Sequence, residues 1–160
     1  MDAPSPILDC ARVIAYAEVG LEIPFRQAFQ LYVGGELLGR VPALAICINL
    51  RDESDVLLFH CDSDWNVLGA GGATSVDAAK DRAEANYPGI SACWRHMDTT
   101  LGAAMKYFDD TWPEDKCSFC GKRSFEIEHL ISGDHAAICE GCVQKYFEAL
   151  SSSRGGAGSG

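Results

Sequence analysis

The chain has few positive charges for its size. Its 160 residues include 13 Lys and Arg against 23 Asp and Glu, which gives a formal net charge of −10. Binding to nucleic acid depends on Lys and Arg side chains that neutralise backbone phosphates, so we do not expect nucleic acid to be the main partner. A basic protein is a better match, because opposite electrostatic potentials steer two proteins together.

Long apolar segments are also missing. No apolar run approaches the roughly 18–20 residues that a membrane span requires. The opening residues, Met-Asp-Ala-Pro-Ser-Pro, lack the positive and apolar regions of a secretory signal. We therefore expect a cytoplasmic protein with no membrane contact, whose cysteines are buried as thiols or bound to metal. The alternative is a secreted scaffold held together by disulfide bonds.

Familiar catalytic motifs are absent too, since the sequence contains neither His-Glu-x-x-His nor Gly-x-Ser-x-Gly. Two weaker candidates remain. His60 and Cys61 lie at the end of an expected strand, but adjacent strand residues point to opposite faces. Gly69–Gly72 resembles part of a dinucleotide-binding loop but lacks the third glycine and the acidic partner of that motif. We expect no enzyme, and keep as an alternative a small enzyme that uses either region.

The strongest positive signal comes from four of the eight cysteines. They form two pairs with the same internal spacing, Cys117-x-x-Cys120 and Cys139-x-x-Cys142. Such pairs are typical of structural zinc sites, and four thiolates close a tetrahedral coordination sphere without leaving a position for substrate. We therefore predict one structural Zn²⁺ ion. The alternatives are disulfide bonds, or the replacement of one cysteine ligand by His129 or His135.

Residues 1–112 are predicted to form an α+β domain, in which an antiparallel sheet is flanked by helices. Apolar alternation and turn residues favour strands at 25–33, 37–40, 43–50, 56–61, 65–68 and 90–94. The Gly34-Gly35 pair between the first two strands is a hairpin signal. Residues 69–73 are expected to form a loop, because three of the five are glycine.

Helices are predicted at 6–17, 76–86 and 99–112. The first would begin after the capping residue Ser5, with Pro6 in the first helical position, and would end at Gly20. The second would follow a capping box from Thr74 to Asp77 and stop before Pro88, which cannot continue a helix.

Residues 113–150 are predicted to form a small C-terminal zinc module. A segment this short cannot build a self-sufficient core and needs a metal to hold it together. Its last part, 143–150, is predicted to be a helix with Cys142 at the N-terminal end, where the helix dipole favours a thiolate. Residues 151–160 are rich in Ser and Gly and are expected to be a flexible tail.

Three stretches of this module share one pattern: Cys-Ser-Phe-Cys-Gly-Lys at 117–122, Ile127-x-x-Leu130-Ile131-x-Gly133, and Ile138-Cys139-x-x-Cys142-Val143. In these positions the sequence resembles the N-terminal zinc-binding domain of the ClpX unfoldase. The resemblance implies a treble-clef-like module that forms homodimers and binds other proteins through apolar surface. It implies a partner-binding role for four apolar residues, Phe119, Ile127, Leu130 and Ile131. The alternative is that these side chains fill the core around the metal.

The rest of the chain departs from the unfoldase. It has no Gly-x-x-x-x-Gly-Lys-[Ser/Thr] phosphate-binding loop, and the zinc module stands at its C-terminal end. We expect a bacterial, cytoplasmic, adaptor-like protein that binds a protein partner without catalysis, with a zinc module that mediates dimerisation or docking. The alternative is an immunity or antitoxin-type inhibitor, in which the acidic domain neutralises a basic toxin.

Overall fold

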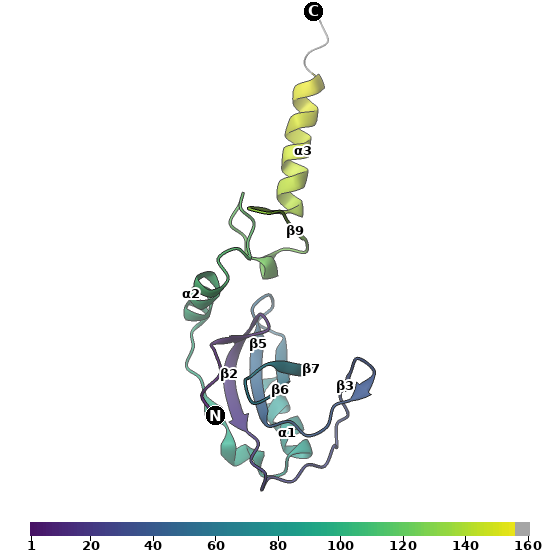
Figure 1. Ribbon diagram of the computed structural model, residues 1–160, viewed down its shortest axis with the longest axis vertical. Helices are drawn as coiled ribbons and strands as arrows, with labels where there is room; N and C mark the ends of the chain where they lie inside the picture. The colour runs from purple at the N-terminus through teal and green to yellow at the C-terminus, as the bar shows by residue number, and fades with distance from the viewer. Residues whose placement is uncertain (156–160) are drawn as a thin grey trace, which may run out of the picture. The chain divides into compact units, whose positions relative to one another are not determined.

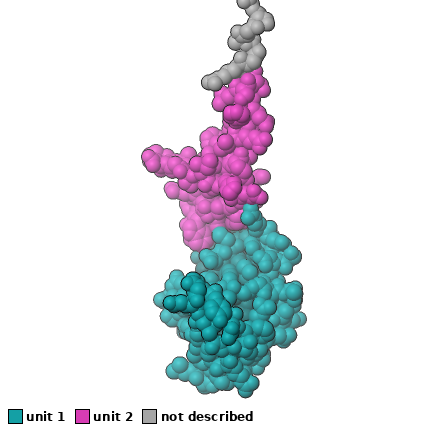
Figure 2. Space-filling model, turned by 90° about the vertical axis from the view of Figure 1, so that its right-hand side faces the viewer, with its two compact units in different colours: residues 1–107 teal, residues 108–160 magenta. Residues whose placement is uncertain are grey.

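The computed structural model describes residues 1–155. The chain divides into two compact units, Met1–Tyr107 and the residues from Phe108 onward, which Figure 2 colours teal and magenta. Together they show the expected mixed α+β composition, with an antiparallel sheet and a small C-terminal module. The boundary between the units falls inside a helix and not after Trp112, where the sequence predicted the junction.

An antiparallel sheet forms the centre of unit 1 (Figure 1). In the described residues the strand order is β1-β2-β5-β6-β7, and β8 also pairs with β2. The bounds of these strands are β1 Ile7–Leu8, β2 Ala11–Glu18, β5 Ala43–Asn49, β6 Val56–Cys61, β7 Val67–Ala73 and β8 Arg95–His96. The strands predicted at 43–50 and 56–61 are confirmed, and they pair with each other in the middle of the sheet.

The helix predicted at 6–17 is wrong, because this segment forms β1 and β2. Asp9 and Cys10, both at positive φ (47° and 59°), make the tight turn between these two strands. Apolar residues at 11, 13, 15 and 17 repeat every second position, which suits a strand as well as the helical reading. β2 pairs with β5 along its whole length, and this tertiary pairing decided between the two conformations.

Both faces of the sheet are buried. On one face α1 (Val76–Asn86) covers a core that includes Ala17, Leu44, Ile46, Leu58, Ala79, Ala83 and Tyr87 (Figure 1). On the other face a second core includes Leu8, Val13, Tyr16, Ala43, Ala45, Cys47, Phe59, Cys61 and Trp65. Successive residues of β5 therefore enter opposite cores, which explains why this strand reads as a nearly continuous apolar run.

Between β2 and β5 the chain makes a long excursion that contains a hairpin of β3 (Tyr32–Val33) and β4 (Glu36–Leu37). The predicted turn at Gly34-Gly35 is confirmed, and both glycines have positive φ (59° and 87°). The strand expected from residue 25 begins only at Tyr32. The buried side chain of Asn86 accepts a hydrogen bond from the Phe29 N–H at 2.7 Å and donates to the Phe29 carbonyl at 3.2 Å. A side chain therefore satisfies this backbone in place of a sheet neighbour.

The remaining elements of unit 1 include two further corrections. Residues 69–73, expected as a loop, belong to β7, and the strand expected at 90–94 is the 3₁₀ helix η1 (Ile90–Cys93). The short helix forms because the Glu84 carboxylate accepts hydrogen bonds from Gly89 and Ser91, which fixes the turn before it. The helix predicted at 76–86 is confirmed as α1, although Ser75 rather than Thr74 caps it. The helix predicted at 99–112 is confirmed as α2 (Leu101–Thr111).

Unit 2 contains the 3₁₀ helix η2 (Ser124–Glu126), a small hairpin of β9 (Leu130–Ser132) and β10 (Ala137–Cys139), and helix α3 (Glu140–Gly155). The helix predicted at 143–150 is confirmed and is longer at both ends. The segment expected to be a tail therefore begins as helix: residues 151–155 continue α3, while 156–160 lie outside the described residues. Within residues 1–155, no helix combines the length and the apolar character needed to cross a bilayer.

Candidate metal centre

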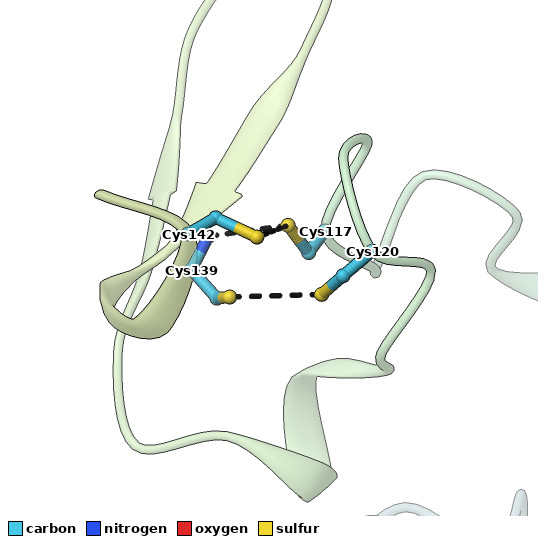
Figure 3. Close-up of side chains that lie close together, drawn as sticks. All are labelled: Cys117, Cys120, Cys139 and Cys142. Atoms are coloured by element: carbon cyan, nitrogen blue, oxygen red, sulfur yellow. Dashed lines mark hydrogen bonds between the residues drawn. The ribbon is translucent and has the colours of Figure 1, made fainter. Parts of the chain in front are cut away.

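The four predicted ligands come together in unit 2 (Figure 3). The sulfur atoms of Cys117, Cys120, Cys139 and Cys142 all lie within 4.8 Å of one another. Two of the separations are 3.8 Å, between Cys117 and Cys142, and 3.7 Å, between Cys120 and Cys139. A tetrahedron of Zn–S bonds about 2.3 Å long places its sulfur atoms about 3.8 Å apart. The cluster therefore fits one structural Zn²⁺ ion.

The two alternative readings of this motif do not fit the same geometry. A disulfide bond requires a sulfur–sulfur distance of about 2.05 Å, and none of the eight cysteines, all of which lie in the described residues, forms one. His129 and His135 are exposed and lie outside the cluster that the described residues form. The site is therefore a four-sulfur site, with no histidine in place of a cysteine.

Local backbone structure places each pair of sulfur atoms. After Cys120 the chain reverses at Gly121, whose φ of +76° favours glycine. The Cys117 N–H donates to the Lys122 carbonyl at 2.8 Å, which closes this first knuckle. The second pair spans the end of β10 and the first turn of α3, so Cys142 lies where the N-terminal end of a helix favours negative charge.

The burial and close spacing of the sulfur atoms favour a bound cation. Burial opposes ionisation of Cys117, but hydrogen bonds from neighbouring backbone amides, first among them that of Cys139 at 3.4 Å, lower the pKa of its thiol to about 6. At Cys142 burial, and then the proximity of the other three sulfur atoms, raises the pKa of the thiol to about 12. Four thiolates cannot gather at these distances without a compensating positive charge, and Zn²⁺ supplies it.

Further contacts join the two knuckles into one module. Ser118 exchanges hydrogen bonds with Ala137 on β10: its N–H donates to the carbonyl at 2.8 Å and its Oγ accepts from the N–H at 3.0 Å. The Glu140 carboxylate accepts from the backbone N–H groups of Glu128 and His129. Three of the ligand cysteines, Cys117, Cys139 and Cys142, also form a small core with the buried Ile127, against which Leu130 and Ile138 pack.

Residues 115–151 match the family model of the ClpX C4-type zinc finger. This match agrees with the resemblance that the sequence pattern indicates. The matched residues all lie within unit 2. No solved structure matches the chain. The comparison and the sulfur geometry together show that the C-terminal part of this protein is a structural zinc module.

The four residues that the resemblance implied as partner-binding differ in their exposure. Phe119 and Ile131 are 56% and 59% exposed, so both present apolar surface to solvent. Leu130 is partly buried against the core around the cysteines, and Ile127, at 7% exposed, is a member of that core. Sequence reasoning did not single out Val143 and Phe147 on α3, which are also exposed. Their spacing of four residues on a predicted helix was the available signal.

The alternative site at His60 and Cys61 is not assembled. His60 alternates with Leu58 on the face covered by α1, and burial lowers the pKa of its imidazole. Cys61 belongs to the core of the opposite face, where burial, followed by the nearby Asp62, raises the pKa of its thiol to about 12. A thiol with this pKa stays protonated near neutral pH, so this pair does not offer a thiolate nucleophile.

Of the glycines in the second alternative site, Gly69 has a packing role in unit 1. A Cβ atom at Gly69 would lie 2.9 Å from methyl groups of both Leu31 and Val33, on the excursion that carries the β3–β4 hairpin. A Cβ at Gly71 would lie 3.5 Å from the guanidinium of Arg82, which donates to the Gly72 carbonyl. The glycines therefore lie within a strand over which other side chains pack, rather than in a phosphate-binding loop.

Replacing Gly69 with alanine tests this explanation. We expect Gly69→Ala to destabilise unit 1 by about 1–3 kcal/mol, because the added methyl group overpacks the contact with Leu31 and Val33. The matched control is Gly72→Ala, since a Cβ there has nothing within 4 Å. Denaturant unfolding followed by circular dichroism would measure both variants. Equal stability of the two variants would contradict the packing role of Gly69.

Proposed function

We propose that this is a non-catalytic, adaptor-like protein of the cytoplasm, in which the zinc module docks onto a protein partner or a second copy of the chain. The observation that carries this proposal is an open apolar groove beside the metal site. It encloses about 820 Å³ and is lined by Glu128, His129, Leu130, Ile131, Glu140, Val143, Gln144 and Phe147. Four sulfur ligands leave the zinc ion no open coordination position for catalysis. The role of the metal is therefore to hold the fold that presents this surface.

The apolar part of the groove is unusually exposed for a module this small. Ile131 from β9 and Phe147 from α3 are 59% and 69% exposed, and Val143 between them is 40% exposed. A module with so few apolar residues gains most by burying them. Contiguous apolar surface that stays outside the core marks a protein-interaction site.

The charge around the groove favours a basic occupant. Glu128 and Glu140 are the acidic side chains that line it, and the described residues of the lining include no Lys or Arg. The whole chain carries a formal charge of −10. A segment that combines apolar side chains with Lys or Arg would match both the groove and its rim.

The double substitution Ile131→Ser with Phe147→Ser tests the docking surface. We expect the variant to lose self-association, or to lose the partner that the wild-type chain captures from the native cytosol, because both apolar anchors are removed. Light scattering and affinity capture would measure the two outcomes. Metal analysis should still find one zinc per chain, since neither residue is a ligand.

The matched control is Leu21→Ser in unit 1, because Leu21 is 95% exposed and lies outside the groove. This variant should behave as the wild type in both assays. A groove variant that keeps both its oligomeric state and its captured proteins would contradict the proposed function.

A further inference from the structure

We propose that zinc binding controls the helical state of α2, the helix that contains the boundary between the two units. This inference goes beyond the docking function, because it concerns the connection between the units and not the groove. It rests on how the C-terminal end of α2 is held within unit 2.

Three consecutive residues that follow the first knuckle each hold one residue at or just beyond this end of α2. Arg123 forms a bidentate pair with Asp109, with Nε–Oδ1 and Nη2–Oδ2 distances of 2.8 and 2.6 Å. The Ser124 Oγ donates to the Asp115 carboxylate at 2.7 Å. The ring of Phe125 meets that of Phe108 edge to face, with centroids 4.9 Å apart.

The positions of Arg123, Ser124 and Phe125 depend on the folding of the first knuckle, the turn from Cys117 to Lys122. They lie between the ligand Cys120 and Ile127, which belongs to the core around the cysteines. The Lys122 carbonyl, directly before them, accepts the N–H of the ligand Cys117. Small structural zinc modules owe their folding to the metal. Loss of zinc therefore removes the fixed positions of Arg123 and Phe125, which contact Asp109 and Phe108.

Helix α2 has little stability of its own. It has 11 residues, and isolated helices shorter than about 12–15 residues are marginal in water. Gly102 in its first turn lowers the helix propensity further. The buried Ala104 and Phe108 lie four residues apart on one face, so the helix depends on packing along that face. We expect α2 to lose helical structure when the module loses its metal.

Amide hydrogen exchange on the full-length chain, before and after removal of zinc by a chelator, tests the proposal. We expect the amides of the last turn of α2, residues 107–111, to exchange at least about tenfold faster in the metal-free chain. The amides of β5 and β6 in unit 1 serve as an internal control and should keep their protection. Protection in α2 that persists while residues 117–142 lose theirs would overturn the proposal, as would an equal loss throughout unit 1.

The variant Arg123→Gln tests the contribution of the Arg123–Asp109 contact without removing the metal. It should keep one zinc per chain, because Arg123 is not a ligand, and yet speed exchange in the last turn of α2 by about fivefold, since a charge-assisted bidentate pair is lost. The matched control Arg95→Gln removes an exposed arginine that pairs with Glu18 in unit 1 and should leave α2 unchanged. Unchanged exchange in the Arg123→Gln variant would also count against the proposal. None of these outcomes depends on whether the groove binds a partner.

Discussion

Replacing the ligand Cys139 with serine is expected to unfold the C-terminal module while the sheet of unit 1 stays folded. Cys139 is 3% exposed and belongs both to the sulfur cluster and to the small core around it. Structural zinc in finger peptides contributes an apparent binding free energy of about 10–16 kcal/mol at neutral pH. That is more than the roughly 3–5 kcal/mol that the core of so small a module can supply. Three sulfur ligands and a serine should therefore not hold the fold.

Metal analysis and amide exchange would check this result together. The wild-type chain should contain one zinc, and Cys139→Ser should contain little or none, with rapid exchange over residues 115–151. The control Cys10→Ser changes a cysteine in the β1–β2 turn, outside the cluster, and should retain its zinc. Full zinc content in the Cys139→Ser variant, or slow exchange of the module without metal, would show that sulfur coordination does not stabilise it.

The zinc centre was predictable from the sequence because its information is local. Two Cys-x-x-Cys pairs specify the ligands, and the glycine after Cys120 and the helix that starts near Cys142 have recognisable chemistry. The groove was harder to foresee. It is lined by residues of both β9 and α3, which the fold of the module brings to one surface although β10 lies between them in the chain.

The sheet of unit 1 was predictable only in part. The central strands β5 and β6 are apolar on both faces and show clearly as strands. The segment 6–17 has both helical and alternating periodicity, and the pairing of β2 with β5, a contact between distant residues, selected the strand. Gly69–Gly72 indicated a loop because the sequence does not reveal that Leu31 and Val33 pack over the strand at Gly69.

Tyr87 is expected to be the most sensitive aromatic position of unit 1. It is 1% exposed and follows the last residue of α1. Its hydroxyl oxygen accepts the Val41 N–H at 3.0 Å, and its ring lies 5.0 Å from that of Phe25. Burial raises the pKa of the hydroxyl, so it stays protonated at neutral pH. One side chain thus links the end of α1 to both ends of the excursion between β2 and β5.

Two substitutions at this position separate the hydrogen bond from the packing. Tyr87→Phe leaves the buried Val41 N–H without its acceptor and should cost about 1–3 kcal/mol. Tyr87→Ala also opens a cavity next to Phe25 and should cost about 3–5 kcal/mol. The slowest-exchanging amides of β5 and β6 would report the opening free energy of unit 1 alone. This choice matters because a chain with two units need not unfold in one step.

The control for the hydroxyl is Tyr32→Phe, since Tyr32 is 60% exposed on the β3–β4 hairpin. Loss of an exposed hydroxyl should change the opening free energy by less than about 0.5 kcal/mol. If Tyr87→Phe proved as mild as this control, the Val41 N–H would have to find another acceptor, and the hydroxyl would not hold the excursion. A large effect confined to Tyr87→Ala would assign the whole contribution to the ring. Effects of both variants in the expected order would show that one buried residue joins the helix to the start of the central strand β5.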